Sequence, residues 1–467
     1  MPYAHFDRLS ALDASFLDLE SEGVHMHVGT VGTFEAARLS TPSGGLDFDA
    51  ILASSEGALQ RAPRFRQKLA STPVLGHPVW IDDPDFNLLY HLRHTALPLP
   101  GDERRLKRLA GRIMSQKLDR TKPMWEIWFV EGLEGGRFAI ISKVHHCLID
   151  GISGVDLLAS FMGPNEDYRP PEEEHHWIPR PAPGPLRLLA GEVGRRVGAP
   201  TRALRTFARS VQNPAENLEA AVHNATGFFE GLGKAFSSAS ETPLNVPIGP
   251  HRRFDWTRFD LGVVREVQEK LGGTVNDVVL ACVTGAVRSF LQRHEVEVED
   301  IDFRAFVPVS TRTAAQRGSL GNRVSMLVTP IPVDEPDPRR RVEKIRAETV
   351  ELKKSGQAAG TEVLEEIIDW TSPSLLTALS RLAASQRSFN LVVTNVPGPQ
   401  VPVYLNGARL LESYPLVPLF ENQALGVALF SYDGGLYWGF NADWDALPDL
   451  HEFVLAVEQE FETLRKL

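Results

Sequence analysis

A proline-rich stretch near the middle of this chain of 467 residues separates two regions that both carry strand and helix patterns. Within residues 163–185, a proline occupies every second position from Pro179 to Pro185. Proline lacks the backbone N–H that a helix needs, so this stretch is typical of a linker. A chain of this length exceeds one ordinary core, and we expect two to three domains. We place a first unit at residues 1–165, a linker at 166–250 and a second unit at 251–467.

The two outer regions mix expected strands with expected helices. Apolar residues suit buried strands in some segments and recur every three or four positions in others, as in helices. The first unit has expected strands at residues 28–34, 79–82, 127–131 and 138–144, and expected helices at 46–59, 103–118 and 154–161. The second has expected strands at 254–261, 303–308, 324–332, 391–395, 425–432 and 436–441, and expected helices at 263–271, 276–294, 339–354, 362–369 and 448–466. This succession predicts an α/β fold of two units with a similar layout.

The predicted linker carries a basic helical pattern over residues 186–211. Leu186, Leu189 and Val193 recur at helical spacing, and arginines occupy the polar positions, with Glu192 as the only acidic residue. Such a helix fits a surface that touches anionic lipid. It also fits a helix that packs on its own protein and keeps its basic side in water. The sequence leaves both interpretations open.

The overall charge argues against nucleic acid as the main partner. The net charge is −11 and the isoelectric point is about 5.7, whereas phosphate backbones bind basic surfaces. Cys147 and Cys282 are the only cysteines, which excludes a disulfide framework and fits a reducing cytosol. The N-terminus has no signal-peptide pattern, and the longest apolar run, residues 278–287, is about half of a bilayer span. We therefore expect a cytoplasmic protein whose contacts with an inner membrane or lipid droplet are peripheral.

The most specific chemical signal is a pair of histidines followed by Asp-Gly. An apolar expected strand, residues 138–144, leads directly into His145 and His146, and Asp150 and Gly151 follow. Histidine titrates near neutral pH, so an imidazole at a strand end can take a proton from a hydroxyl. Asp150 can hold the local backbone through hydrogen bonds or a salt bridge, and Gly151 permits a tight chain reversal. The pattern therefore predicts an acid–base site at this strand end.

Four other interpretations compete with this one. The adjacent histidines could be a chance pairing, as we take His175-His176 in the Pro/Glu-rich linker to be. His145, His146 and Asp150 could bind a metal ion, but neighbouring residues of a strand point to opposite faces, and we expect no metal. The histidines could instead be hydrogen-bonded core residues, and His145 in particular suits a structural role. Cys147 could act as a nucleophile, but on a strand its side chain would point away from that of His146.

The string from His145 to Gly151 resembles the HHxxxDG motif of the coenzyme A-dependent acyltransferase superfamily, which includes chloramphenicol acetyltransferase and peptide-synthetase condensation domains. Other segments resemble the bacterial wax ester synthase/acyl-CoA:diacylglycerol acyltransferase family over roughly residues 5–465. These segments are 9–17, 26–29, Pro123-Met124-Trp125-Glu126, Asn276-Asp277-Val278, 308–312, Gly321-Asn322 and 395–399. Met124 stands where the family usually has leucine, a change that preserves volume and apolarity.

This resemblance implies two chloramphenicol-acetyltransferase-like domains, each a mixed β-sheet with flanking helices, and an active-site tunnel at their interface. The second motif histidine, His146, would be the catalytic base, and His145 would be its structural neighbour. Asp150 would be structural and pair with an arginine elsewhere in the chain, for which Arg312 is our candidate.

The resemblance also places Asn276 and Asp277 beside the active site. Asn276 could cap the expected helix that begins there, or it could donate a hydrogen bond near the reacting carbonyl. Asp277, Pro123 and Trp125 would contact substrate or support the site. The segment 395–399, which reads as a turn, would help to join the two halves.

The implied activity is transfer of a long-chain acyl group from acyl-CoA to the hydroxyl of diacylglycerol or a long-chain alcohol, without a bound cofactor. Coenzyme A thiolate leaves readily, so no acyl-enzyme is needed, which agrees with the absence of a Gly-x-Ser-x-Gly nucleophile elbow. The main alternative is a condensation-type or polyketide-associated acyltransferase with a carrier-bound donor, which activity with free acyl-CoA would distinguish. A lipid-surface binding protein without catalysis is a third hypothesis.

Overall fold

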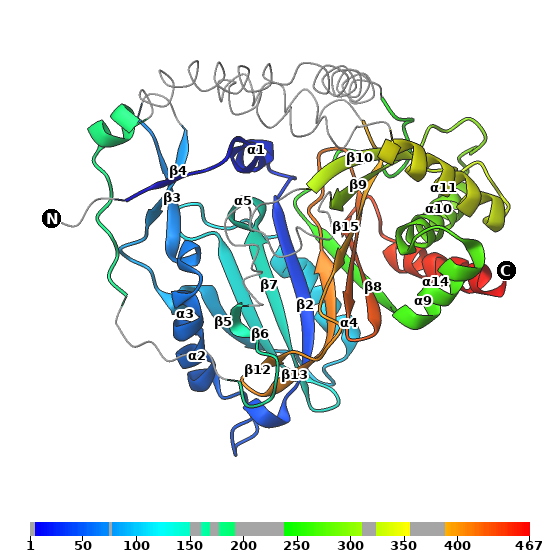
Figure 1. The fold of residues 1–467 in the computed structure, drawn as a ribbon. Coiled ribbons are helices and arrows are strands. Elements are labelled where there is room, and N and C mark those ends of the chain that lie inside the picture. The colour runs from blue at the N-terminus through cyan, green and yellow to red at the C-terminus, as the bar shows by residue number, and fades with distance from the viewer. Residues whose placement is uncertain are drawn as a thin grey trace, which may run out of the picture.

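The computed structural model describes residues 5–73, 77–149, 160–168, 177–191, 238–310, 324–354 and 388–467, which form two six-stranded sheets and one three-stranded sheet. The two large sheets stand side by side, each built mostly from one half of the chain (Figure 1). The described residues form two apolar cores, and the core of the first sheet also takes in Phe254, Trp256, Tyr432 and Tyr437 of the second sheet. The two-unit α/β architecture predicted from the sequence is thereby confirmed.

The first large sheet has the strand order β12-β13-β2-β7-β6-β5. Its strands from the first half are β2 (His27–Glu35), β5 (Leu92–Ala96), β6 (Trp125–Leu133) and β7 (Arg137–His145). β7 lies inside the sheet and is buried along its length after Arg137, which explains the apolar run that begins at Phe138. β2 pairs antiparallel with β7, and their register sets His27 opposite His145.

The other elements of the first half flank this sheet. The helices are α1 (Ala11–Leu19), α2 (Phe48–Gln60), α3 (Leu88–His91) and α4 (Glu103–Met114), with 3-10 turns at Ala37–Leu39 and Pro63–Arg66. The three-stranded sheet has the order β1 (Asp7–Arg8), β4 (Pro78–Asp82) and β3 (Gln67–Ser71). α4 buries Leu106, Ala110 and Ile113 at helical spacing and ends four residues before the predicted end at residue 118.

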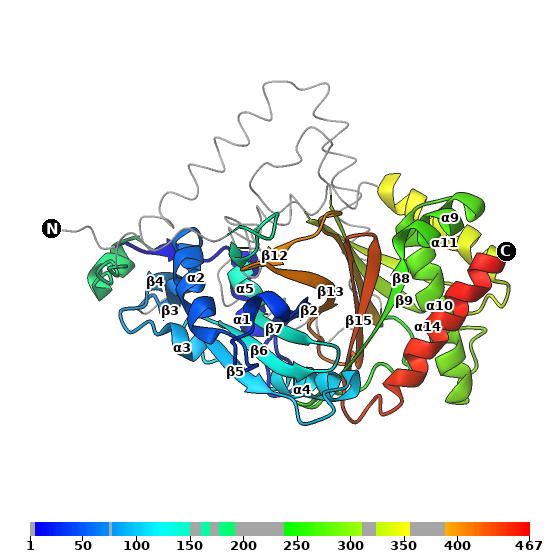
Figure 2. The ribbon, with the colours of Figure 1, turned by 90° about the horizontal axis from the view of Figure 1, so that it is seen from below.

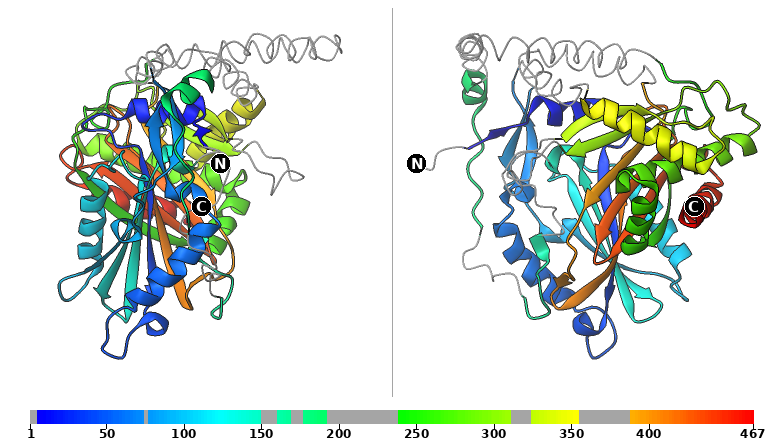
Figure 3. Two further views of the ribbon diagram at one scale, coloured as in Figure 1. Left: turned by 90° about the vertical axis from the view of Figure 1, so that its left-hand side faces the viewer. Right: turned by 45° about the vertical axis from the view of Figure 1, so that its right-hand side comes forward.

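The second large sheet has the strand order β10-β9-β11-β14-β15-β8. Its strands are β8 (Arg252–Asp260), β9 (Arg304–Ser310), β10 (Val324–Pro330), β11 (Leu391–Pro397), β14 (Leu425–Tyr432) and β15 (Gly435–Asp443). The helices α9 (Leu261–Leu271), α10 (Val275–Arg293), α11 (Pro338–Lys354) and α14 (Leu450–Lys466) cover the face turned away from the first half (Figures 1 and 3). α10 packs among these helices, so its residues 277–287 are all buried.

Two strands of the second half cross over to the first sheet. They are β12 (Tyr404–Leu405) and β13 (Ala408–Leu416), and β13 pairs antiparallel with β2. Seen from below, β13 lies where the two sheets meet, beside β15 (Figure 2). Gly439 of β15 permits this approach, because a Cβ there would lie 1.8 Å from the Pro415 carbonyl oxygen. Residues 404–416 thus complete the first sheet although they follow the predicted boundary at residue 251.

A few predicted elements differ from the structure or lie outside its described part. Asn395 to Pro397 belong to β11, so the predicted turn at 395–399 is wrong for its first three residues. The predicted helix at 362–369 and most of those at 154–161 and 186–211 lie outside the described residues, as does most of the linker. Among the described helices, none is long and apolar enough to cross a membrane by itself, although α9 and α10 reach that composition as a pair bent by 92°.

Candidate active site

His146 lies where the chain leaves the first sheet. β7 ends at His145, and His146 is the first residue of a four-residue helix, α5 (His146–Ile149). The His146 N–H donates to the Met26 carbonyl oxygen at 2.7 Å, and its half-buried imidazole packs on Phe16 with ring centroids 4.0 Å apart. The expectation that one strand carries both histidines is wrong, because the pairing of β7 with β2 stops at His145.

His145 is enclosed by the protein. Its side chain is 1% exposed, and its Nδ1 accepts the N–H of Cys147 at 3.2 Å. Because Nδ1 accepts this hydrogen bond, the ring N–H is assigned to Nε2, which faces Oε1 of Glu20 at 3.3 Å. Nδ1 is thus bonded within the protein and Nε2 faces a buried carboxylate, which suits a structural histidine better than a metal ligand or a base.

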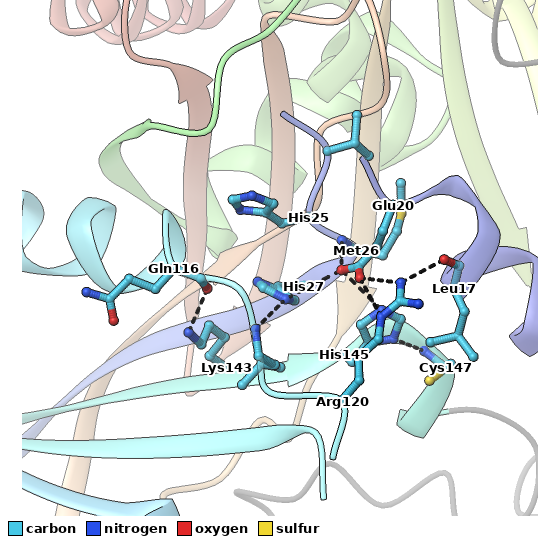
Figure 4. A network of polar contacts seen from close by, with 12 residues as sticks. Leu17, Glu20, His25, Met26, His27, Gln116, Arg120, Lys143, His145 and Cys147 are labelled. Carbon is cyan, nitrogen blue, oxygen red and sulfur yellow. Dashed lines mark hydrogen bonds and ion pairs between the residues drawn. The ribbon is translucent and has the colours of Figure 1, made fainter. Parts of the chain in front are cut away.

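A buried glutamate, Glu20, connects the segments around the two motif histidines (Figure 4). Its Oε1 accepts the Met26 N–H at 3.2 Å and lies 3.7 Å from Nε2 of His27. Its Oε2 accepts from Nη2 of Arg120 at 2.6 Å. Burial raises the pKa of Glu20, but its interaction with His145 and the hydrogen bond from Arg120 outweigh this effect and hold the pKa far below its usual value. Glu20 is thus an anion at neutral pH.

Two further histidines near this carboxylate are neutral. Burial, with a smaller effect of the charge on Lys143, lowers the pKa of His27 well below its usual value. Burial, followed by the charge of Arg252, lowers the pKa of His25 to about 4. At neutral pH, Arg120 is therefore the main positive partner of Glu20.

Cys147 shows none of the features of an activated thiol. Its side chain is buried, and burial, followed by the charges of Asp13 and Glu20, raises its pKa well above the usual value. A thiol is nucleophilic as the thiolate, and this environment keeps the proton on sulfur. The prediction that Cys147 is not the nucleophile rests on this burial rather than on the strand geometry from which it was first argued.

Pro123 and Trp125 support the end of β7 from its other side. Trp125 is the first residue of β6 and is fully buried, and its Nε1–H donates to the Phe65 carbonyl oxygen at 2.7 Å. Between them, the Met124 carbonyl oxygen accepts the His145 N–H at 3.0 Å. The contacts of this segment are internal, so they favour support of the site over contact with substrate.

The start of α10 brings together three polar residues and corrects one prediction. Thr274, not Asn276, is the N-cap, and it forms a capping box in which the Asp277 carboxylate accepts the Thr274 N–H at 2.7 Å. Asp277 also accepts from the Thr349 hydroxyl at 2.9 Å, so both of its oxygens serve the fold. Oδ1 of Asn276 accepts from Nδ2 of Asn395 at 2.7 Å. The amide nitrogen of Asn276 is therefore the atom that can donate to a substrate.

Asp150, Gly151 and Arg312 lie outside the described residues, so their roles stay predictions. Within the described ranges, no group of three or more His, Cys, Asp or Glu side chains is placed to hold a metal ion. Sequence reasoning missed Glu20 and Arg120, which meet although they lie 100 positions apart. Only the folded chain shows this pairing, since neither residue stands in a motif.

Family models match most of the chain. Residues 9–279 match the wax ester synthase/diacylglycerol acyltransferase catalytic domain, and residues 320–465 match the C-terminal domain of the same family. The chain belongs to this family. The resemblance read from the sequence is thereby confirmed, and the protein is an acyltransferase.

Relatives of known name support this assignment over the full chain. A protein of Mycobacterium tuberculosis strain H37Rv that is named as a diacylglycerol O-acyltransferase is 33% identical over 460 residues, which span 96% of this chain and 88% of the relative. The solved wax ester synthase/diacylglycerol acyltransferase from Marinobacter aquaeolei VT8 has a TM-score of 0.67 and 28% identity, over 98% of this chain and 100% of that one. A starter condensation domain of rhizomide synthetase shares the fold, with a TM-score of 0.56 and 13% identity over 99% and 94% of the two chains.

Proposed function

We propose that this enzyme transfers a long-chain fatty acyl group from acyl-CoA to the hydroxyl of diacylglycerol, a long-chain alcohol or both. The products would be triacylglycerol or wax esters. Family membership supports acyl transfer, and the names of the relatives support these two acceptor classes. The observation that carries the proposal is the placement of His146 at the head of α5, with its half-buried ring against Phe16 and its main chain bonded to Met26.

His146 acts as the general base in this proposal. Its imidazole takes the proton of the acceptor hydroxyl as that oxygen attacks the thioester carbonyl carbon. The tetrahedral intermediate then collapses, the C–S bond breaks, and the new ester C–O bond remains. The imidazolium returns its proton to the departing coenzyme A thiolate, which restores the base.

Transfer is direct in this proposal, without an acyl-enzyme and without a bound cofactor. Coenzyme A thiolate is a good leaving group, so a protein nucleophile would add a step without need. Cys147 is the nucleophile nearest to His146 in sequence, and its buried thiol with a raised pKa speaks against that role.

Asn276 is the proposed donor to the thioester carbonyl oxygen. Its Oδ1 is bonded to Asn395, which leaves Nδ2 to stabilise the charge that develops on that oxygen. We place the substrates in a tunnel between the two halves, with acyl-CoA entering from one face and the acceptor from the other. In this proposal Asp150 pairs with Arg312 and holds the turn at Gly151.

The proposed acceptors are lipids, which dissolve poorly in water. We therefore propose a cytoplasmic enzyme that meets its acceptor at the surface of a membrane or lipid droplet. The segment that we propose for this lipid contact is residues 186–211, whose sequence has a basic helical pattern.

Release of free thiol from palmitoyl-CoA tests this function, with diacylglycerol and hexadecanol offered separately and the ester products identified by mass spectrometry. We expect release that depends on an acceptor, and the faster acceptor is then the preferred one. No release by folded enzyme with either acceptor would contradict the proposal and favour a carrier-bound donor or a lipid-binding role. Release without any acceptor would indicate thioester hydrolysis instead.

A further inference from the structure

We propose that Glu20 is a positioning residue for His146, because it anchors the three groups that hold this histidine and does so without touching substrate. The inference rests on the proposed role of His146 as the base. Glu20 is the C-cap of α1, and its side chain is only 8% exposed. Its carboxylate lies among His27, His145 and Arg120, at the centre of the network in Figure 4.

The first of these groups is the main chain of Met26. Oε1 of Glu20 accepts the Met26 N–H at 3.2 Å, and the Met26 carbonyl oxygen accepts the His146 N–H at 2.7 Å. The first N–H groups of a helix have no partner within that helix. Met26 supplies the partner for the first of them, and Glu20 fixes Met26.

The second group is the ring of His145. Nε2 of His145 faces Oε1 of Glu20 at 3.3 Å, and Nδ1 accepts the Cys147 N–H at 3.2 Å. A carboxylate beside Nε2 keeps the proton there, which leaves Nδ1 as an acceptor. If the proton moved to Nδ1, the bond to Cys147 would be lost. The second N–H group of α5 therefore also depends on Glu20.

The third group is the aromatic ring that packs on the base. Arg120 donates to Oε2 of Glu20 at 2.6 Å and, through the same Nη2, to the Leu17 carbonyl oxygen at 2.8 Å. Leu17 follows Phe16 in α1, and the Phe16 ring lies 4.0 Å from that of His146. Arg120 thus ties the carboxylate to the helix that carries this ring.

Loss of the Glu20 charge should therefore misplace the base and leave the substrate sites intact. A displacement of about 1 Å can lower a rate by roughly a hundredfold. For Glu20→Gln, which keeps the side-chain length but replaces one acceptor oxygen by a donor, we expect kcat to fall by about ten- to a hundredfold. The KM for palmitoyl-CoA should stay close to that of the wild type, because Glu20 is enclosed by protein groups.

The two cysteines give a second readout that does not need activity. Both thiols are buried, Cys147 in α5 and Cys282 in α10. Labelling of each thiol in the native protein, followed by peptide mass spectrometry, measures how often each site opens. In Glu20→Gln we expect Cys147 to label several-fold faster while Cys282 labels at the wild-type rate. A merely general loss of stability would accelerate both.

Glu460→Gln is the matched control, since the Glu460 side chain is only 13% exposed and is paired with Arg341 at 3.0 Å, on α14 of the second half. It should change neither kcat nor the labelling of Cys147. Arg120→Lys keeps the positive charge but replaces the planar guanidinium, whose Nε and Nη2 both donate to Oε2 of Glu20, by a single flexible ammonium group. It should reproduce the Glu20→Gln pattern in a weaker form, and it decides the question if Glu20→Gln does not fold.

Wild-type kcat and wild-type labelling of Cys147 in folded Glu20→Gln would overturn the proposal, and so would equal acceleration of both cysteines. Absence of thiol release by the wild type would instead contradict the proposed function. The labelling of Cys147 would still show, in that case, whether Glu20 holds the start of α5.

Discussion

His146 and Cys147 are adjacent in the chain, yet the protein surrounds their side chains differently. The imidazole of His146 is half-buried beside Phe16, whereas the Cys147 thiol is buried and its pKa is raised by that burial. The difference arises at one backbone step, where β7 ends at His145 and α5 begins. If the strand continued through both residues, their side chains would lie on opposite faces of the sheet. That alternation alone would not predict that one side chain is half-buried and the other buried.

Buried neutral histidines make the stability of the protein depend on pH. Burial lowers the pKa of His25 and that of His91 to about 4, from an ordinary value of 6.5. As the pH falls below about 6.5, the unfolded chain takes up protons on these rings, whereas the folded protein does so only near pH 4. Because the unfolded state binds more protons in this window, the free energy of unfolding should fall as the pH falls from 6.5 to 4.

The variant His91→Gln tests this linkage. Glutamine does not titrate, and its amide can still donate to the Trp125 carbonyl oxygen, which Nδ1 of His91 contacts at 2.8 Å. Between pH 6.5 and 4, we expect the fall in stability to become shallower by up to about 1.4 kcal/mol per pH unit. Urea denaturation at several pH values measures the slope, and an unchanged slope would contradict a neutral buried His91.

At the level of helices and strands, the sequence predicted those elements whose apolar spacing is regular. α10 is found at Val275–Arg293 against a prediction of 276–294, and β7 extends the predicted 138–144 by one residue at each end. β13 was missed, because Ala408–Leu416 pairs along most of its length with β2 of the other half, and its spacing alone does not indicate a strand. Pairing between distant segments decides such a strand.

The candidate site was predictable where it coincides with a motif and unpredictable where it depends on contacts between distant residues. The motif led to His146 and to its structural neighbour His145. Glu20 and Arg120 could not be found, since their contact joins residues 20 and 120 across the fold. Asp277 was expected to contact substrate or support the site, and its carboxylate oxygens serve a helix cap and Thr349.

Thr274→Ala tests the assignment of the helix cap. It removes the acceptor for the Asp277 N–H, so we expect the free energy of unfolding to fall by about 1 kcal/mol. Thr274→Ser keeps the hydroxyl and should retain most of the stability. Chemical denaturation measures both variants, and thiol release by the folded enzymes should stay near the wild-type rate. Loss of activity without loss of stability would mean that the start of α10 serves substrate rather than the helix.

At the level of the whole molecule, the two halves share a strand and a buried charge. β13 carries the second half into the first sheet. Arg252, at the start of β8, is buried. Its guanidinium donates to the carbonyl oxygen of Gly23 in the first half and to that of Gly249, just before the second half begins. These contacts hold the segment before β2, which includes Met26, against the second half.

Gly439→Ala tests how tightly the halves meet. The added Cβ would lie 1.8 Å from the Pro415 carbonyl oxygen, which belongs to the backbone and cannot swing aside. We expect the free energy of unfolding to fall by about 1–3 kcal/mol, as it does for overpacked cores. Gly184→Ala is the control, because a Cβ there meets no atom within 4 Å. Equal urea midpoints for the two variants would show that β13 and β15 are not in close contact.

The measurement that tests the central claim most directly is the acceptor-dependent release of thiol from palmitoyl-CoA by the wild type, His146→Ala and His145→Ala, each with its melting temperature. We expect His146→Ala to keep its fold and to lose about two orders of magnitude or more in kcat, as the loss of a general base requires. We expect His145→Ala mainly to harm stability or the geometry of the site, with a lower melting temperature and a smaller loss of kcat than in His146→Ala. If folded His146→Ala kept its turnover while folded His145→Ala lost it, His146 would not be the base.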